Sequence, residues 1–241
     1  MAAGDTKHSK AGGALRSGAG AFYGRRVGHR LRPRRAALIE ELLPRLAIDV
    51  SRPPPADLAV LFPACREAVS LEIGFGGAEH LVAQARAHPL AGFLGCEPFV
   101  NGMAKALAAV DALRLDNIRF HHGDATAVLD WAPAASLERV ELIYPDPWPK
   151  RRHWKRRFVQ DASVAAIGRV LKPGGEFRFA TDWPDYAAWT LERLIRFPGF
   201  VWTAERADDW RRPWPDFCGT RYEAKALRAG RKPCYLTFRR A

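Results

Sequence analysis

One carboxylate, Asp146, stands between two prolines and beside an indole in the run Pro145-Asp146-Pro147-Trp148. The prolines restrict the backbone, so the acid and the ring keep a fixed relation. Six cations and no acid follow between residues 149 and 160. An acidic, aromatic pocket beside a basic surface suits a protein that binds a polyanion and holds one flat polar group, such as a nucleic-acid base. The alternative is a stiff turn before a solvated helix.

A second group of residues with chemical potential surrounds a glycine-rich turn, Leu71-Glu72-Ile73-Gly74-Phe75-Gly76-Gly77-Ala78. Gly74 and Gly76 allow the backbone to approach a ligand at the start of a helix. Glu72 precedes them, Glu97 ends the next apolar run, and Asp124 ends the third. Parallel strands end at one edge of a sheet, so we expect these acids to converge on one crevice, with Glu97 suited to ribose hydroxyls. Ordinary strand-end capping is the alternative for each acid alone.

The charge of this turn favours one cofactor class. A dinucleotide site usually has Gly or Ala at the sixth loop position, where this chain has Glu79. An acid would repel a pyrophosphate, whereas the amine and sulfonium of S-adenosyl-L-methionine favour nearby carboxylates. Glu72 and Glu79 therefore favour S-adenosyl-L-methionine over NAD.

The elements that position these residues follow from periodicity. Short apolar runs alternate with longer amphipathic ones, which predicts a doubly wound, mostly parallel α/β sheet. Lys172-Pro173-Gly174-Gly175 is a strong helix stop. Predicted strands cover 69–73, 93–96, 118–121, 140–143, 177–180, 200–203 and 235–238, and predicted helices cover 78–87, 100–115, 158–171 and 183–197.

Composition sets the wider limits. The chain has 241 residues, 48% of them hydrophobic, and a net charge of +12 that leaves an acidic block at 53–147 between basic flanks. Segregation of this kind indicates a cofactor site with separate polyanion-binding edges. We predict a disordered tail at 1–21, a basic arm and helix at 22–55, and a catalytic domain at 56–241. No apolar run is long enough to span a membrane, and 1–20 lacks the apolar core of a secretory signal.

The four cysteines stand far apart without a CxxC pair. This spacing predicts reduced thiols in a cytoplasmic protein and no bound metal. The sequence leaves monomer and homodimer open.

Six motifs occur in the order typical of one family: Glu-Ile-Gly-Phe-Gly, Gly-Cys-Glu, His-Gly-Asp-Ala, Pro-Asp-Pro-Trp-Pro-Lys, Ala-Thr-Asp-Trp and Thr-Arg-Tyr-Glu-Ala-Lys. From about Phe22 to Phe238 the chain resembles the bacterial tRNA (guanine-N7-)-methyltransferases. The resemblance implies a class I methyltransferase sheet of seven strands with an antiparallel last strand. It also implies methylation of the variable-loop guanine at position 46 of tRNA, with S-adenosyl-L-methionine as donor. Ala78 departs from the glycine common in related sequences, which predicts a modest effect on cofactor affinity.

The resemblance also implies roles for single residues. Glu72, Glu97, Asp124 and Asp146 match cofactor-contacting positions, whereas substrate-contacting positions are matched by Lys150, Asp182, Thr220, Arg221, Tyr222 and Glu223. The basic residues expected to bind RNA phosphates are Arg25, Arg26, Arg151, Arg152, Lys155, Arg156 and Arg157. Independently of the family, a carboxylate matches the Watson–Crick edge of guanine and an aromatic ring matches its face.

Guanine N7 has a lone pair and no proton, so positioning supplies most of the rate and no base is needed. We expect Asp146 to be catalytic by orientation and by stabilising the cationic purine. Three alternatives remain open at this point. They are an NAD-dependent oxidoreductase, a methyltransferase acting on an exocyclic amine of rRNA or DNA, and a non-catalytic RNA-binding module.

Overall fold

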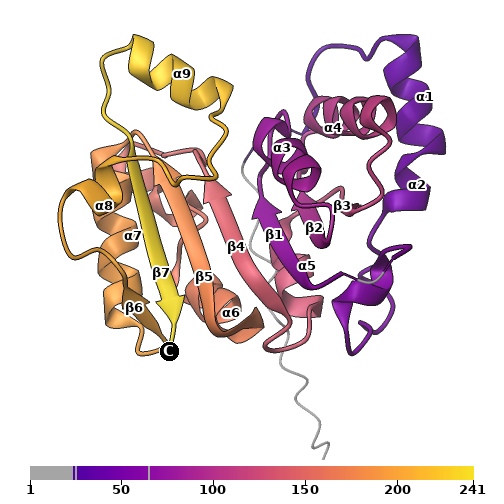
Figure 1. Ribbon diagram of the computed structural model, residues 1–241. Coiled ribbons are helices and arrows are strands. Elements are labelled where there is room, and N and C mark those ends of the chain that lie inside the picture. Colours follow the sequence, from indigo (N-terminus) through magenta and orange to yellow (C-terminus); the bar gives the residue numbers. More distant parts are fainter. Residues whose placement is uncertain (1–23, 25, 65) are drawn as a thin grey trace, which may run out of the picture.

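The computed structural model describes residues 24, 26–64 and 66–241. Seven strands form one sheet in the order β3-β2-β1-β4-β5-β7-β6 (Figure 1). The strands are β1 (Ala68–Ile73), β2 (Ala91–Cys96), β3 (Ile118–His121), β4 (Leu137–Ile143), β5 (Leu171–Thr181), β6 (Phe200–Trp202) and β7 (Cys234–Arg240). The first five are parallel, and β7 runs antiparallel to β5 and β6. The predicted doubly wound sheet with an antiparallel last strand is confirmed.

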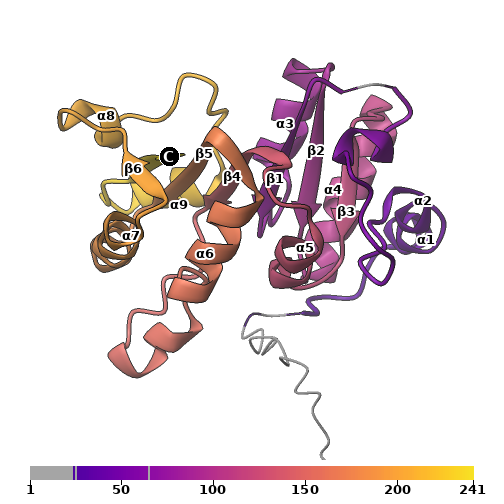
Figure 2. The same ribbon diagram turned by 90° about the horizontal axis from the view of Figure 1, so that it is seen from below.

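Helices cover both faces of the sheet (Figure 2). They are α1 (Pro33–Glu41), α2 (Leu43–Leu46), α3 (Glu79–Ala87), α4 (Val100–Leu113), α5 (Ala125–Trp131), α6 (Asp161–Val170), α7 (Pro184–Arg196), α8 (Asp208–Arg211) and α9 (Arg221–Arg228), with 3-10 turns η1 (Leu58–Leu61) and η2 (Arg151–Arg156). One apolar core lies between β1, β4 and β5 and the helices α5 to α7. A second core joins α3 and α4 to β2 and β3.

The described part of the N-terminal arm packs onto the second core. Leu38, Ile39 and Leu42 of the α1–α2 segment are partly buried against that core, and α1 lies beside α4. The predicted tail at 1–21 and the RNA-binding candidate Arg25 lie outside the described residues. The division of the chain at residue 55 stays a prediction.

Two local predictions were wrong. The helix expected at 158–171 begins at Asp161, where Gln160 and Ser163 form a capping box. The strand expected at 177–180 begins at Leu171. Residues 172–175 do follow the end of α6 at Val170, but they belong to β5, where the register with β4 shifts between Leu137 and Arg139. Helices α5, α8 and α9 were not predicted.

The central strands carry charge where a doubly covered sheet usually carries apolar side chains. Val140 and Leu142 of β4 belong to the first core, while Arg139 and Glu141 face the opposite side. That side is covered by the segment 212–219, which connects α8 to α9. In the described ranges, Cys96, Cys218 and Cys234 are free thiols, and no helix there is long and apolar enough to cross a membrane.

Candidate functional site

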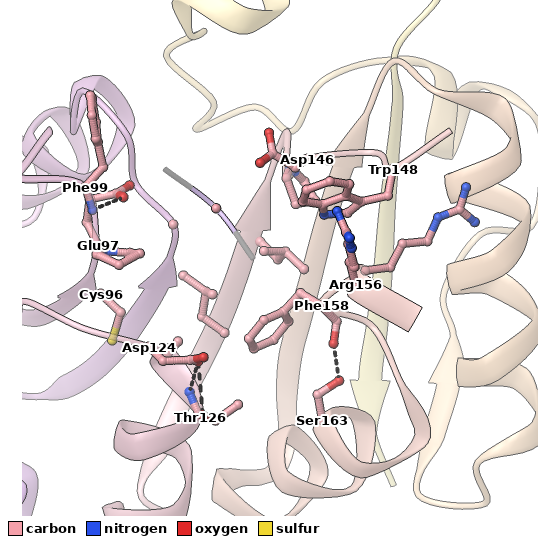
Figure 3. Close-up of a pocket in the computed structure, with 18 of the residues that line it drawn as sticks. Cys96, Glu97, Phe99, Asp124, Thr126, Asp146, Trp148, Arg156, Phe158 and Ser163 are labelled. Atoms are coloured by element: carbon pink, nitrogen blue, oxygen red, sulfur yellow. Dashed lines mark hydrogen bonds between the residues drawn. The ribbon is translucent and has the colours of Figure 1, made fainter. Parts of the chain in front are cut away.

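A cavity of about 550 Å³ opens at the carboxyl edge of the sheet (Figure 3). Its lining combines residues after four successive strands with one residue from α9: Gly74 and Gly76 after β1, Glu97 after β2, Asp124 after β3, Asp146 after β4, and Tyr222. Glu97 and Asp124 lie on one side of it, and Asp146 and Trp148 lie on the other. Of the three acids expected to converge, Glu97 and Asp124 line this cavity and Glu72 does not, and Asp146 joins them from the fourth strand.

Glu97 is tied to the glycine-rich turn. One carboxylate oxygen accepts the amide of Gly76 at 2.6 Å, and the other accepts the amide of Phe99 at 2.9 Å. Burial raises the pKa of Glu97, and these two backbone donors oppose that rise. Each carboxylate oxygen keeps acceptor capacity after one such bond, so Glu97 can also accept ligand hydroxyls.

The turn is held closely by its neighbours. A side chain on Gly102 in α4 would meet the carbonyl oxygen of Gly76 at 2.3 Å, so only glycine allows this approach. Ala78 is buried and takes a left-handed conformation, φ 61°, immediately before α3. A methyl-bearing residue in that region is strained, which agrees with the glycine expected there. Ala78 thus occupies a position whose left-handed backbone conformation favours glycine.

Asp124 has two roles in the structure. It lines the cavity, and its side chain accepts the Thr126 amide at 2.9 Å as the N-cap of α5. The capping alternative considered from the sequence therefore holds alongside exposure to the cavity.

Glu72 lies apart from the cavity lining, although it was predicted to contact the cofactor. Its side chain is buried with those of His80 and Glu141, and the ligand-type atoms of the three lie within 4.8 Å of one another. Burial raises the pKa of Glu72 to about 8. Burial alone would lower the pKa of His80, but its contacts with Cys218 and Glu141 and the charge of Glu72 raise it to about 10. Glu72 is therefore a buried residue of β1 next to the glycine-rich turn in sequence, and it does not face the cavity.

This buried group has the residue types of a metal site. The guanidinium nitrogens of Arg139 and Arg178 come within 4.0 Å and 3.9 Å of a Glu141 oxygen. They supply positive charge where a cation would bind, so the group is balanced without a metal. The prediction of no bound metal stays a prediction.

The loop that carries Asp146 is strained at both ends. Tyr144 and Trp148 have positive φ angles of 49° and 44°. Such conformations persist where the surroundings enforce them and are concentrated at functional sites. The Pro147 carbonyl oxygen accepts the Nε–H of Arg157 at 3.0 Å, which anchors the loop from below. Asp146 itself is exposed at the mouth of the cavity.

The basic run divides into two kinds of residue. Lys150, Arg151, Arg152 and Lys155 are exposed, and the guanidinium of Arg156 lies 5.0 Å from the ring centre of Trp148. Arg157 was predicted to bind RNA, and this was wrong: it is 2% exposed. Its guanidinium lies over three rings at 4.7 to 5.2 Å, those of Trp154, Tyr186 and Trp189. It cannot reach a phosphate without unpacking that cage.

The predicted substrate residues lie around α9. Thr220 caps the helix by accepting the Glu223 amide at 3.1 Å, and the Glu223 carboxylate accepts a hydrogen bond from the Tyr235 hydroxyl. Asp182 accepts the Nε–H of Arg231 at 2.5 Å. Arg221 is exposed, 4.0 Å from a carboxylate oxygen of Glu79. Of the predicted substrate residues only Tyr222 lines the cavity. The others lie outside its lining: Lys150, Asp182, Thr220, Arg221 and Glu223.

Arg26, the described one of the two RNA-binding candidates in the arm, lines a smaller cavity together with Asp124. Its carbonyl oxygen accepts the Val100 amide at 3.0 Å, so the arm is attached at the start of α4.

Sequence reasoning missed Tyr144 and Tyr235, whose hydroxyl oxygens are 3.4 Å apart and connect the Asp146 loop to Glu223. It also missed Asp216 and its two arginine partners. The alternation of charge in β4 and β5, such as Arg139 and Glu141, was the available signal for a polar covering segment.

Comparison with known proteins gives a consistent result. A family model described as "Putative methyltransferase" matches residues 66–236. A protein of Nitrobacter hamburgensis named tRNA (guanine-N(7)-)-methyltransferase is 60% identical over 224 residues, which cover 93% of this chain and 88% of that protein. A protein of the same name from Rhodopseudomonas palustris strain BisB18 is 62% identical over 221 residues, covering 92% and 88%.

Solved structures agree on the fold. The 16S rRNA methyltransferase KamB has a TM-score of 0.55 at 16% identity and covers 73% of this chain and 89% of its own. TrmN from Thermus thermophilus has a TM-score of 0.53 at 16% identity, with 73% of this chain and 45% of its own covered. At this identity, the likeness concerns the fold alone.

Proposed function

This chain belongs to the tRNA (guanine-N(7)-)-methyltransferase family, and from that premise we propose that its target is the guanine at position 46 of the tRNA variable loop. The reaction is methyl transfer from S-adenosyl-L-methionine to N7 of guanine in tRNA. The oxidoreductase, the exocyclic-amine methyltransferase and the non-catalytic module considered from the sequence are set aside by this membership. The observation that supports this cavity as the site of methyl transfer is that Glu97, Asp124, Asp146 and Tyr222 all line it.

The cavity suits S-adenosyl-L-methionine. The Glu79 carboxylate lies so close to the turn that a side chain on Gly77 would meet its oxygen at 2.4 Å. Such an acid disfavours a pyrophosphate and favours a cationic ligand. We assign Gly74, Gly76, Glu97 and Asp124 to the cofactor, with Glu97 as acceptor of ribose hydroxyls. When bound, this cofactor supplies an electrophilic methyl group.

The chain's own residues position the guanine. N7 needs no base, so binding in an oriented state supplies most of the acceleration. Attack leaves the purine cationic, and Asp146 at the mouth of the cavity offers a fixed carboxylate to that charge. Glu223 and Asp182 present carboxylates suited to the Watson–Crick edge, and Tyr222 offers a ring to the face of the base. Thr220 and Arg221 belong to the same helix start.

The basic surface binds the tRNA backbone. Lys150, Arg151, Arg152 and Lys155 are exposed beside the cavity, and Arg156 lines it. Contacts of this kind position the RNA and carry little sequence information. Arg26 extends the surface on the other side of Asp124.

The experiment uses the full chain, an unmodified tRNA transcript with guanine at position 46, and labelled S-adenosyl-L-methionine. We expect labelled 7-methylguanosine in the nucleoside digest, and no label in a transcript with adenine at 46. Label at another guanine would overturn the position. Absence of 7-methylguanosine would overturn the function.

A further inference from the structure

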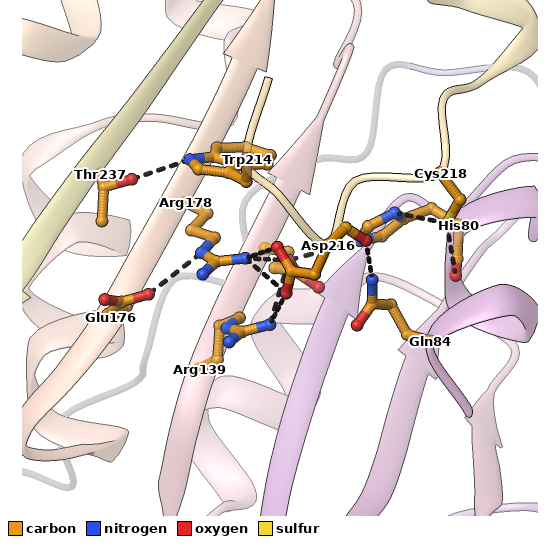
Figure 4. A network of polar contacts seen from close by, with 10 residues as sticks. His80, Gln84, Arg139, Glu176, Arg178, Trp214, Asp216, Cys218 and Thr237 are labelled. Carbon is orange, nitrogen blue, oxygen red and sulfur yellow. Dashed lines mark hydrogen bonds and ion pairs between the residues drawn. The ribbon is translucent and has the colours of Figure 1, made fainter. Parts of the chain in front are cut away.

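The segment 212–219, termed the strap from here on, lies across the charged face of β4 and β5 (Figure 4). It is fixed at one end by Trp214, which is 8% exposed and donates its indole N–H to the Thr237 hydroxyl at 2.8 Å. Phe217 packs edge-on against Trp214 and Tyr235, with ring centres 5.7 and 5.6 Å away. The strap is therefore seated on the sheet.

Asp216 forms the central contact of the strap. Its carboxylate accepts from Arg178 Nη1 at 2.8 and 3.0 Å and from Arg139 Nη1 at 2.9 Å. Its carbonyl oxygen accepts the side-chain amide of Gln84 from α3 at 2.5 Å. Burial opposes ionisation of this acid, but the two guanidiniums outweigh it and hold the pKa of Asp216 below its usual value. One residue thus joins β4, β5 and α3.

The contact has an electrostatic reason. Arg178 is only 11% exposed and Arg139 is 26% exposed. A guanidinium nitrogen of each lies within 4.0 Å of the same oxygen of the buried Glu141. Arg178 also pairs with Glu176 of β5 at 3.0 Å. Among the described residues of the sheet, Arg139 has only the Glu141 oxygen as an acid partner, at 4.0 Å. The close acid partner of Arg139 therefore comes from outside the sheet. Asp216 is that partner at 2.9 Å, so a displaced strap would leave the partly buried Arg139 without its nearest acid.

The strap leads directly into the proposed base-binding helix. After Cys218, which lies 3.4 Å from the Nδ1 of His80, Gly219 turns the chain with φ 74° and Thr220 caps α9. In α9 only Ala226 is buried, so the helix has little packing of its own. The position of Tyr222 over the cavity therefore depends on where the strap is held.

We propose that Asp216 is a positioning residue for the target guanine: its contacts with Arg139 and Arg178 hold the strap, and the strap holds α9, which places Tyr222 at the cavity and carries Glu223 beside it in sequence. This inference rests on the proposed function for its substrate. The contacts of Asp216 with Arg139 and Arg178, termed the latch from here on, rest on the distances given above. Asp216 touches neither cofactor nor base in this arrangement. It does not line the cavity.

The test compares the full chain with Asp216→Asn, which keeps the shape and removes the charge. We expect kcat/KM for tRNA to fall at least about 10-fold, as loss of a charge-assisted contact does, while the dissociation constant of S-adenosyl-L-methionine changes less than twofold. Asp216→Glu restores part of the rate. The matched control is Glu192→Gln, which removes an acid from an exposed ion pair with Arg196 in α7, away from the strap. The control should keep the wild-type rate.

Hydrogen exchange tests the latch without substrate. In Asp216→Asn, exchange in 221–228 should accelerate severalfold while exchange in α6 stays at its wild-type rate. Unchanged exchange in α9, or equal losses of cofactor and tRNA affinity, would overturn the inference. If wild-type protein makes no 7-methylguanosine, the proposed function fails, and the exchange result still decides the latch.

Discussion

The Glu223 carboxylate at the start of α9 accepts a hydrogen bond from the Tyr235 hydroxyl in β7. A residue on a thinly packed helix is thereby attached to the sheet. The Tyr144 hydroxyl oxygen lies 3.4 Å from that of Tyr235, so the chain of polar groups reaches the loop that carries Asp146. The two carboxylates proposed to face the guanine are connected through two tyrosines.

Tyr235→Phe should lower kcat/KM for tRNA about 5-fold, because freeing the Glu223 carboxylate costs about 1 kcal/mol of oriented hydrogen bonding. Cofactor affinity should stay at the wild-type value. Steady-state kinetics with unmodified tRNA measure this. Tyr186→Phe is the matched control, since it removes a buried hydroxyl that accepts the Val159 amide away from α9. An equal loss in both variants would contradict the specific role of Tyr235.

Glu97→Ala should weaken S-adenosyl-L-methionine binding by about 1.5–3 kcal/mol, as expected when a charged acceptor is lost. The variant also leaves the Gly76 and Phe99 amides without their partner, so the turn loses its support. Calorimetric titration measures the affinity, and circular dichroism confirms the fold. Glu97→Gln keeps the size and one acceptor oxygen and should show a smaller loss. Wild-type affinity in Glu97→Ala would refute the ribose assignment.

Asp146→Asn should retain most tRNA affinity, because phosphate contacts dominate binding. Methyl transfer should slow by about 10²-fold, the usual effect of removing one preorganised electrostatic contact. Asp146→Ala should be at least as slow. Single-turnover rates at saturating tRNA and cofactor decide this. Near wild-type rates in both variants would transfer the catalytic role to Asp182 or Glu223.

Neutralising Arg151, Arg152 and Lys155 together should weaken tRNA binding and flatten its salt dependence, by about 0.7–0.9 in slope for each lost contact. The matched control neutralises Arg86, Arg114 and Arg196. These residues lie at the carboxyl ends of α3, α4 and α7, at the sheet edge opposite the cavity. Both triple variants have the same net charge. Equal salt slopes in the two would mean that binding follows overall charge alone.

The buried Glu72 and His80 predict a pH-dependent stability. Both pKa values are raised, to about 8 and about 10, so the folded state holds protons that the unfolded chain releases from pH 4.5 and 6.5 upward. The free energy of unfolding should therefore fall as pH rises from 6.5 to 8, by roughly 2 kcal/mol per pH unit, because both groups contribute. Urea unfolding at several pH values measures the slope. Glu72→Gln should flatten it, and an identical slope would refute the assignment.

The sheet was predictable because its signals are local. Runs such as Phe93 to Cys96 are apolar and bounded by turns, and acids placed after parallel strands meet at one edge of the sheet. Helix α9 also left a local signal, since Thr220 and Glu223 have the spacing of a capping box. We interpreted those residues as substrate contacts and did not predict the helix.

Burial of charge was less predictable. The position of Arg157 in a run of cations suggested an exposed side chain, whereas the rings that enclose it include Tyr186 and Trp189 from α7, distant in sequence. The displacement of Glu72 from the cavity has the same origin. Its partners His80 and Glu141 come from α3 and β4, and no local pattern indicates that the three are buried together.

The strap and α9 both belong to the connection between β6 and β7, whereas the glycine-rich turn and the acids assigned to the cofactor all precede β4. The acids proposed for the methyl donor and the α9 residues proposed for the base thus occupy separate stretches of one gene, with Asp146 and Asp182 between them. Mutations in 203–233 can change which nucleotide is accepted and leave the donor site intact. Replacing this one connection with that of a related enzyme should therefore be enough to alter the choice of target. The replacement must keep an acid that pairs with Arg139 and Arg178.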